Sequence, residues 1–126
     1  MENITINGTA RIPTVNLNAQ TGILELKGKS ILENTSDFYT PIIDWLIEYA
    51  KNPQEKTVLN IKLEYFNTSS SKCFLSIFKK LEMMVKNNTD VIVNWLYDAE
   101  DSDMLEAGEN YQSIVNLPFH MIENNN

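Results

Sequence analysis

Several residue types are scarce in this chain, and each scarcity narrows the range of possible functions. The 126 residues include a single arginine, Arg11, and the 10 Lys+Arg are outnumbered by 17 Asp+Glu, which gives a formal net charge of −7. Proteins that bind the nucleic-acid backbone need clustered Lys and Arg to displace its counterions. We therefore expect no nucleic-acid partner.

Cysteine, histidine and glycine are also rare. The lone Cys73 can form neither an intramolecular disulfide nor a Cys-rich zinc site, which is typical of proteins from a reducing compartment. The only histidine, His120, falls near the end of an expected strand, where a packing or surface role is more common than catalysis. The four glycines are scattered and form no phosphate-binding loop. We expect no cofactor and no histidine-dependent catalytic centre.

Long apolar runs are missing as well. No stretch reaches the roughly 18 consecutive apolar residues that a membrane-spanning helix requires. The first residues lack the basic segment and apolar core of a secretion signal. Both observations predict a cytoplasmic protein without membrane contact.

The composition that remains suits one self-supporting domain. Hydrophobic residues make up 43% of the chain, and a domain of this size buries roughly two-thirds of the surface that its unfolded chain exposes. No internal repeat or linker divides the sequence. We expect a single domain over residues 1–126 with a core from about 11 to 122, an edge strand or flexible segment over 1–10, and a disordered tail over 123–126.

The spacing of apolar residues predicts an α/β fold. A β-hairpin is expected over Thr14–Leu17 and Ile23–Lys27, with Gly22 in its turn. Pro41 allows the regular part of the first helix to begin only there. This order favours a compact mixed sheet with parallel pairs, flanked by about three helices. The expected helices span Ser36–Ala50, Lys72–Lys86 and Ser102–Val115, and the expected later strands span Thr57–Phe66, Val91–Tyr97 and Leu117–Ile122.

The strand patterns also predict which way some side chains face. The segment Val91–Tyr97 is almost entirely apolar, as a strand covered on both faces would be. Alternation along Thr57–Phe66 places Tyr65 on the apolar face and therefore in the core. Phe66, at the strand end, is a candidate interface anchor. Trp45 and Trp95 both fit buried packing positions, and we assign them no functional role.

Four consecutive hydroxyl residues, Thr68-Ser69-Ser70-Ser71, connect an expected strand to an expected helix. One hydroxyl is enough to cap the helix. A phosphoryl group, with a charge of about −1.5 to −2, is well tolerated at a helix N-terminus, and Lys72 in the same turn could pair with it. The added charge would repel a docked partner or break its hydrogen bonds. The run therefore predicts a phosphorylation switch.

The acidic segment from Asp98 to Glu109 supports a second hypothesis, which is a small metal-assisted enzyme or metal-binding module. Its carboxylates could bind Mg²⁺ or Ca²⁺, although the segment lacks the spacing of an EF-hand loop. The alternative interpretation is a negatively charged helix start, with Asp103 and Glu106 as a capping pair. A purely structural subunit is a third possibility.

Several segments between about Pro13 and Phe119 resemble the SiaC family of bacterial regulatory phosphoproteins. The most specific is Leu63–Lys72 (LEYFNTSSSK). The chain departs from the family pattern in two small ways. Lys29 stands where an Arg is expected, and Leu32 stands where a Pro is expected. The supporting segments are Gly28–Asn34, Pro41–Leu46 with Tyr49, Trp95–Glu109 and Leu117–Phe119.

The resemblance implies a fold similar to the STAS-like anti-sigma-factor antagonists and a non-enzymatic adaptor in a partner-switching circuit. It implies that Thr68 is phosphorylated by a serine/threonine kinase of the histidine-kinase-like ATPase type and dephosphorylated by a PPM-type phosphatase. The unphosphorylated form would bind and activate an effector such as a diguanylate cyclase, in cyclic-di-GMP and biofilm signalling. The residues expected to contact partners around the acceptor are Phe66, Asn67, Ser69, Ser70, Ser71 and Lys72.

Overall fold

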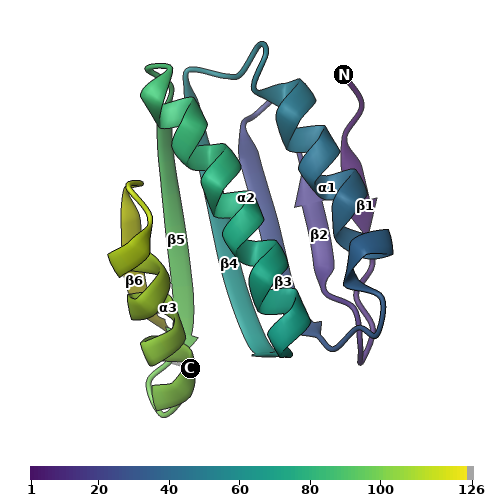
Figure 1. Ribbon diagram of the computed structural model, residues 1–126, viewed down its shortest axis with the longest axis vertical. Coiled ribbons are helices and arrows are strands. Elements are labelled where there is room, and N and C mark those ends of the chain that lie inside the picture. Colours follow the sequence, from purple (N-terminus) through teal and green to yellow (C-terminus); the bar gives the residue numbers. More distant parts are fainter. Residues whose placement is uncertain (125–126) are drawn as a thin grey trace.

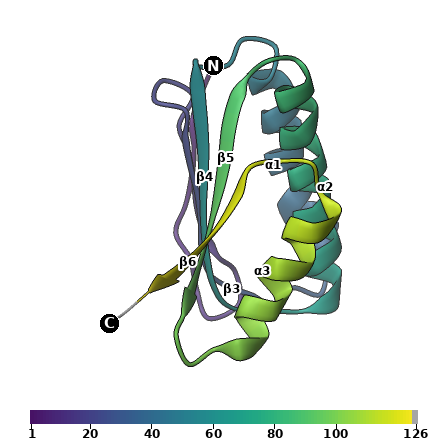
Figure 2. The ribbon, with the colours of Figure 1, turned by 90° about the vertical axis from the view of Figure 1, so that its left-hand side faces the viewer.

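In the computed structural model, which describes residues 1–124, six strands form one mixed sheet and three helices cover one of its faces (Figures 1 and 2). The strands lie side by side in chain order. The β1–β2 and β2–β3 pairs are antiparallel, and the pairs from β3 to β6 are parallel. In chain order the elements are β1 (Ile4–Ile6), β2 (Thr14–Leu17), β3 (Ile23–Ser30), α1 (Thr35–Tyr49), β4 (Lys56–Phe66), α2 (Thr68–Lys86), β5 (Asp90–Asp98), α3 (Ser102–Ile114) and β6 (Phe119–Asn124).

The connections follow the chemistry of the sequence. Gly22, at φ 74°, lies in the turn between β2 and β3, a backbone conformation that glycine adopts without strain. Asn18 Oδ1 tightens this turn by accepting from the N–H groups of Gln20 and Thr21 at 3.0 and 3.1 Å. Each later strand is joined to its parallel neighbour by one helix, as parallel pairing requires. The predicted hairpin and the predicted α/β class with a mixed sheet are both confirmed.

The core lies between the sheet and the three helices. Leu24, Leu59, Val93 and Phe119 are aligned across β3, β4, β5 and β6, and all are buried against the helices. Trp95 is buried as expected, and its indole N–H donates to the carbonyl of Met104 in α3 at 3.0 Å. This alignment explains why buried and half-buried residues alternate along β4 and β5, because only one face of each strand contacts the helices.

The prediction that β5 is covered on both faces is wrong. All three helices lie on the same side of the sheet (Figure 2), and Ile92 and Leu96 are half-buried on the uncovered side. The apolar composition of β5 therefore does not reflect two-sided burial. The uncovered face carries a polar row aligned across five strands, consisting of Asn16, Glu25, Asn60, Asn94 and His120.

Several element ends differ from the predicted ones. α1 begins at Thr35, capped by Asn34, and continues through Pro41, so the expectation that the regular helix begins at Pro41 is wrong. The last strand begins at Phe119 and includes Glu123 and Asn124, which pair with β5; the rest of the expected disordered tail, residues 125–126, lies outside the described residues. Within residues 1–124, no helix combines the length and apolar character needed to cross a membrane.

Candidate functional site

The start of α2 is set by Asn67, which is the N-cap of this helix. Asn67 Oδ1 accepts from the N–H of Ser70 at 3.0 Å, and Asn67 Nδ2 donates to the carbonyl of Leu32 at 2.9 Å. The Asn67 N–H also donates to the carbonyl of Ser30 at 3.0 Å. The expectation that one of the hydroxyl residues caps the helix is therefore wrong. The run Thr68–Ser71 forms the first turn of α2, which begins at Thr68 and not at Lys72.

Ser70 is buried, with 0% of its surface exposed. Its hydroxyl lies 2.7 Å from the hydroxyl of Ser30 and donates to the Ser30 carbonyl at 3.0 Å. The Ser30 hydroxyl is in turn 2.6 Å from the hydroxyl of Tyr39 in α1. Burial raises the pKa of Tyr39, so this hydroxyl keeps its proton. Ser70 therefore joins α2 to β3 and α1, and the prediction that its side chain contacts a partner is revised.

Ser71 and Ser69 are also engaged in hydrogen bonds. The Ser71 hydroxyl lies 2.8 Å from the hydroxyl of Tyr111 in α3, which donates to the Ser71 carbonyl at 2.9 Å. Burial raises the pKa of Tyr111 as well. The Ser69 hydroxyl donates to Asn67 Oδ1 at 3.3 Å. Ser70 and Ser71 thus join the start of α2 to β3 and α3, whereas Ser69 adds one longer hydrogen bond to the N-cap residue.

Thr68 differs from the other three residues of the run. Its side chain is exposed, and its hydroxyl forms no hydrogen bond within residues 1–124. The backbone N–H groups of Thr68 and Ser69 belong to the first turn and have no acceptor inside the helix. Lys72, one turn further along and exposed, takes part in none of the salt bridges found in the described residues. Thr68 is therefore the free hydroxyl at a helix start that is otherwise fixed.

The two aromatic residues before the N-cap differ from expectation. Tyr65, predicted to lie in the core, is exposed, and Phe66, predicted to lie at an interface, packs on the core. Gly28 in β3 pairs with Leu63, whereas Lys29 pairs with Tyr65, so the register shifts by one residue at Glu64. After this β-bulge, Phe66 packs in edge-to-face geometry on Phe74 and Trp95, with ring centroids 5.2 and 6.3 Å apart.

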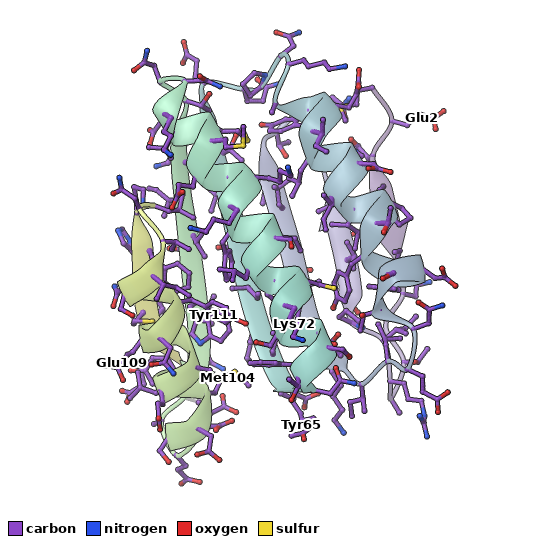
Figure 3. All side chains as sticks on the ribbon, viewed as in Figure 1. Glu2, Tyr65, Lys72, Met104, Glu109 and Tyr111 are labelled. Carbon is purple, nitrogen blue, oxygen red and sulfur yellow. The ribbon has the colours of Figure 1, made fainter. Side chains whose placement is uncertain are left out.

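Tyr65 is 56% exposed and lies near the start of α2 (Figure 3). The prediction that Tyr65 is a core residue is wrong, and Phe66 is a packing residue whose ring is only partly accessible. The sequence does contain one signal for the bulge. Gly28 interrupts a strand pattern, and an isolated glycine inside a strand often marks such a position.

The carboxylates from Asp98 to Glu109 serve separate purposes. Asp101 caps α3 by accepting from the N–H of Met104 at 3.0 Å, so the expected Asp103–Glu106 capping pair is wrong. Asp98 accepts from Asn124 Nδ2 at 3.3 Å. Asp103, Glu106 and Glu109 are exposed on α3. Within residues 1–124, no group of three or more His, Cys, Asp or Glu side chains is arranged to hold a metal ion, which leaves the metal hypothesis without a site geometry.

An α/β domain that displays one free hydroxyl at a rigid helix start, with the neighbouring hydroxyls committed to packing, has the features of a regulatory phosphoprotein. Comparison with family models gives the family itself. The model of the SiaC family of regulatory phosphoproteins matches residues 6–124, and the chain belongs to this family.

Relatives with known structures agree with this assignment. SiaC of Pseudomonas aeruginosa superposes with a TM-score of 0.91 at 28% identity, over 98% of this chain and 100% of that one. A second structure, of the diguanylate cyclase SiaD in complex with its activator SiaC from the same organism, matches with a TM-score of 0.91 at 28% identity, over 96% of this chain and 99% of that one. An uncharacterized protein of P. aeruginosa strain UCBPP-PA14 is 29% identical over 119 residues, which are 94% of each chain. The likeness to STAS-like antagonists stays a prediction.

Proposed function

We propose that this protein is a non-enzymatic adaptor whose binding to an effector is controlled by phosphorylation of Thr68. The observation that carries the proposal is the contrast within the hydroxyl run. Ser69, Ser70 and Ser71 form hydrogen bonds to the protein, whereas the exposed Thr68 hydroxyl forms none within residues 1–124. Thr68 is also the one residue of the run that is exposed, since Ser70 is buried and Ser69 and Ser71 are half-buried. Membership of a family of regulatory phosphoproteins supports control by phosphorylation.

The surroundings of Thr68 suit a phosphoryl group. The free N–H groups of the first turn and the positive end of the helix dipole stabilise negative charge there. Lys72 lies four residues along the helix, within reach of a group on Thr68. The contacts that fix α2 are made by Asn67, Ser70 and Ser71. Phosphorylation would therefore add a charge of about −1.5 to −2 to the surface without breaking these contacts.

The proposed circuit has three protein partners. A kinase of the histidine-kinase-like ATPase type adds the phosphate, a PPM-type phosphatase removes it, and the unphosphorylated form activates an effector in the cytoplasm. The related SiaC of P. aeruginosa is described as the activator of the diguanylate cyclase SiaD. By analogy, the effector proposed here is a diguanylate cyclase that acts in cyclic-di-GMP signalling and biofilm regulation.

The acceptor is tested with ATP, intact-protein mass spectrometry and a purified serine/threonine kinase of the histidine-kinase-like ATPase type from the same genome. Wild type and Ser69→Ala are expected to gain one phosphate, and Thr68→Ala none. Both substitutions remove a hydroxyl from the same turn, so Ser69→Ala controls for altered packing. Phosphate on the Thr68→Ala protein would contradict the site assignment. Incubation of the phosphorylated protein with a purified PPM-type phosphatase from the same genome should restore the original mass.

The effector surface is tested separately with purified diguanylate cyclase from the same genome. Around Thr68, the exposed side chains available to a partner include those of Tyr65 and Lys72. Tyr65→Ala and Lys72→Gln are expected to weaken binding of the unphosphorylated protein without lowering its stability. Lys51→Gln, an exposed lysine just beyond the last turn of α1, is the control. Unchanged affinity in both site variants would place the effector interface elsewhere.

A further inference from the structure

An exposed apolar surface lies at the end of the helix layer opposite Thr68. α1 and α2 run alongside each other, and their C-terminal ends lie opposite the end where α2 begins (Figure 1). Between these ends is a groove of about 230 Å³, whose lining includes Leu46 and Ile47 of α1 and Met83 and Met84 of α2. Thr68 and its neighbours do not contribute to it. We name this surface the α1–α2 groove.

The α1–α2 groove has a buried floor and an exposed apolar rim. Leu46 and Met84 are buried and form the floor. Ile47 is 44% exposed and Met83 is 55% exposed, and they face the same groove from different helices. A single exposed apolar side chain is ordinary, but apolar side chains that meet at one groove form the kind of patch that proteins use for binding. Methionine adapts its shape to varied partners.

Positive charge surrounds Met83 on α2. Its neighbours on the helix surface are Lys79, Lys80 and Lys86, three or four residues away. Glu82 lies 3.7 Å from Lys79 and 4.0 Å from Lys86, but its other carboxylate oxygen accepts from the N–H of Asn116. Lys80, which lines the groove, takes part in no salt bridge within residues 1–124.

The α1 side of the groove has a different character. The α1 residues that line it are Leu46, Ile47 and Ala50, and none of them is charged. The groove therefore has one basic edge on α2 and one uncharged edge on α1. This asymmetry suits a partner with acidic groups on one side better than a uniformly anionic lipid surface.

We propose that the α1–α2 groove binds an amphipathic helix of a partner protein, with apolar side chains against Ile47 and Met83 and acidic side chains against the lysines of α2. A helix fits because the lining residues of α2 recur at positions 80, 83, 84 and 87, a stripe about 10 Å long that matches two turns of a docked helix. Acidic residues beside the apolar stripe complement the basic edge.

This docking site is independent of the state of Thr68 and goes beyond the proposed function. Met83 follows Thr68 by 15 residues of the same helix, or about 22 Å along its axis. That distance exceeds the Debye length of about 8 Å at physiological ionic strength. A phosphate on Thr68 therefore leaves the electrostatics of the groove nearly unchanged. A partner bound there stays attached in both states of the switch.

The first test is photo-crosslinking in the cells from which the gene comes. The photoreactive residue p-benzoylphenylalanine replaces Met83, or Ile114 as a control at a 56% exposed position on α3, and mass spectrometry identifies the adducts. The proposal expects adducts at Met83, and not at Ile114, to a segment with an apolar stripe and an acidic edge. Equal yield is expected in a Thr68→Asp background. No adduct at Met83, or an adduct to lipid, to a second copy of this chain or to a segment without acidic residues, would overturn it.

The second test measures binding of a synthetic peptide with the captured sequence by fluorescence anisotropy. Ile47→Glu and Lys80→Glu are expected to weaken binding by at least about tenfold, whereas Ile114→Glu and Thr68→Asp leave it unchanged. Thermal unfolding of each variant checks that it folds. Equal affinity in all variants contradicts the groove. Loss of binding in Thr68→Asp alone contradicts its independence from the switch. If Thr68 proves not to be the phosphate acceptor, neither the crosslinking nor the peptide-binding result changes. The groove proposal and the proposed function can therefore be disproved independently.

Discussion

The hydroxyls of Ser30 and Ser70 lie 2.7 Å apart, although the two residues are separated by 40 positions in the chain. Together with Tyr39 they form a buried chain of hydroxyl groups that connects the end of β3 to α1 and α2. Because these hydrogen bonds are shielded from water, removing one partner leaves another polar group unsatisfied. The same contact fixes the first turn of α2, on which Thr68 is displayed.

Ser70→Ala is therefore expected to lower the free energy of unfolding by about 1–3 kcal/mol, as measured by urea denaturation. Ser69→Ala is the matched control, because the Ser69 hydroxyl is only part-buried and forms a single bond of 3.3 Å. Its expected effect is within about 0.5 kcal/mol of zero. Equal losses in the two variants would show that the buried chain has no special role.

The contact between Ser71 and Tyr111 leads to a prediction about local motion. Tyr111→Phe removes both hydrogen bonds to Ser71 but retains the ring that packs on Phe78 and Trp95. We expect a loss of about 1 kcal/mol and faster amide hydrogen exchange in the first turns of α2. Tyr65→Phe is the control, because the exposed Tyr65 hydroxyl makes no hydrogen bond within residues 1–124. Exchange that is unchanged in Tyr111→Phe would mean that α3 does not anchor this turn.

The bulge at the end of β4 depends on Gly28, which has a φ of 110°. A Cβ at this position meets only Pro13 Cα, at 3.9 Å, so space is not the obstacle. Gly28→Ala is expected to lower the free energy of unfolding by roughly 1–3 kcal/mol, because an alanine is strained at this positive φ. Lys27→Ala, one residue earlier in β3, should change the stability much less. If Gly28→Ala is as stable as wild type, the bulge does not need a left-handed residue in β3.

Glu82 predicts how stability varies with pH. The hydrogen bond from the Asn116 N–H, helped by the positive charges of Lys79 and Lys86, lowers the pKa of this carboxyl below its ordinary value. Because the folded protein binds this proton less tightly than the unfolded chain, ionised Glu82 stabilises the fold above the unfolded pKa, about 4.3. The contribution is lost as the pH falls through the lower pKa of the folded state.

Denaturation midpoints measured from pH 7 to pH 3 test this sign. At pH 7 the denaturation midpoint of wild type should be higher than that of Glu82→Gln. The difference between the two midpoints should become smaller as the pH falls. Glu109→Gln removes an exposed carboxylate of α3. Its denaturation midpoint should change with pH in the same way as that of wild type. A gap between wild type and Glu82→Gln that widens towards low pH would contradict the assignment.

The sequence predicts the elements of this fold better than their ends. Apolar periodicity identifies β4 and α2 because it depends on residues that are close in the chain. The predicted start of α2 is four residues too late, since Asn and Ser are about equally good caps and the local sequence does not choose between Asn67 and the hydroxyls. The prediction for Tyr65 is wrong because the bulge arises from pairing with Gly28 in another strand.

The candidate site shows the same limit. A run of hydroxyls beside Lys72 draws attention to the first turn of α2, but four residues of similar chemistry cannot be ranked by local pattern. The ranking comes from Ser30 and Tyr111, which are each 40 residues from their partners in the run. Only the folded structure therefore identifies the hydroxyl that makes no hydrogen bond.

Position 68 does not contribute to the contacts that hold the start of α2. Those contacts are the cap at Asn67 and the hydrogen bonds of Ser70 and Ser71. A change of residue at position 68 alters what the surface presents and leaves the contacts that hold the helix intact. Under the proposed function, regulation at this position can thus be gained or lost in evolution by a single codon change. An alanine would give a permanently unmodified protein, and an aspartate a permanently charged one, on the same scaffold.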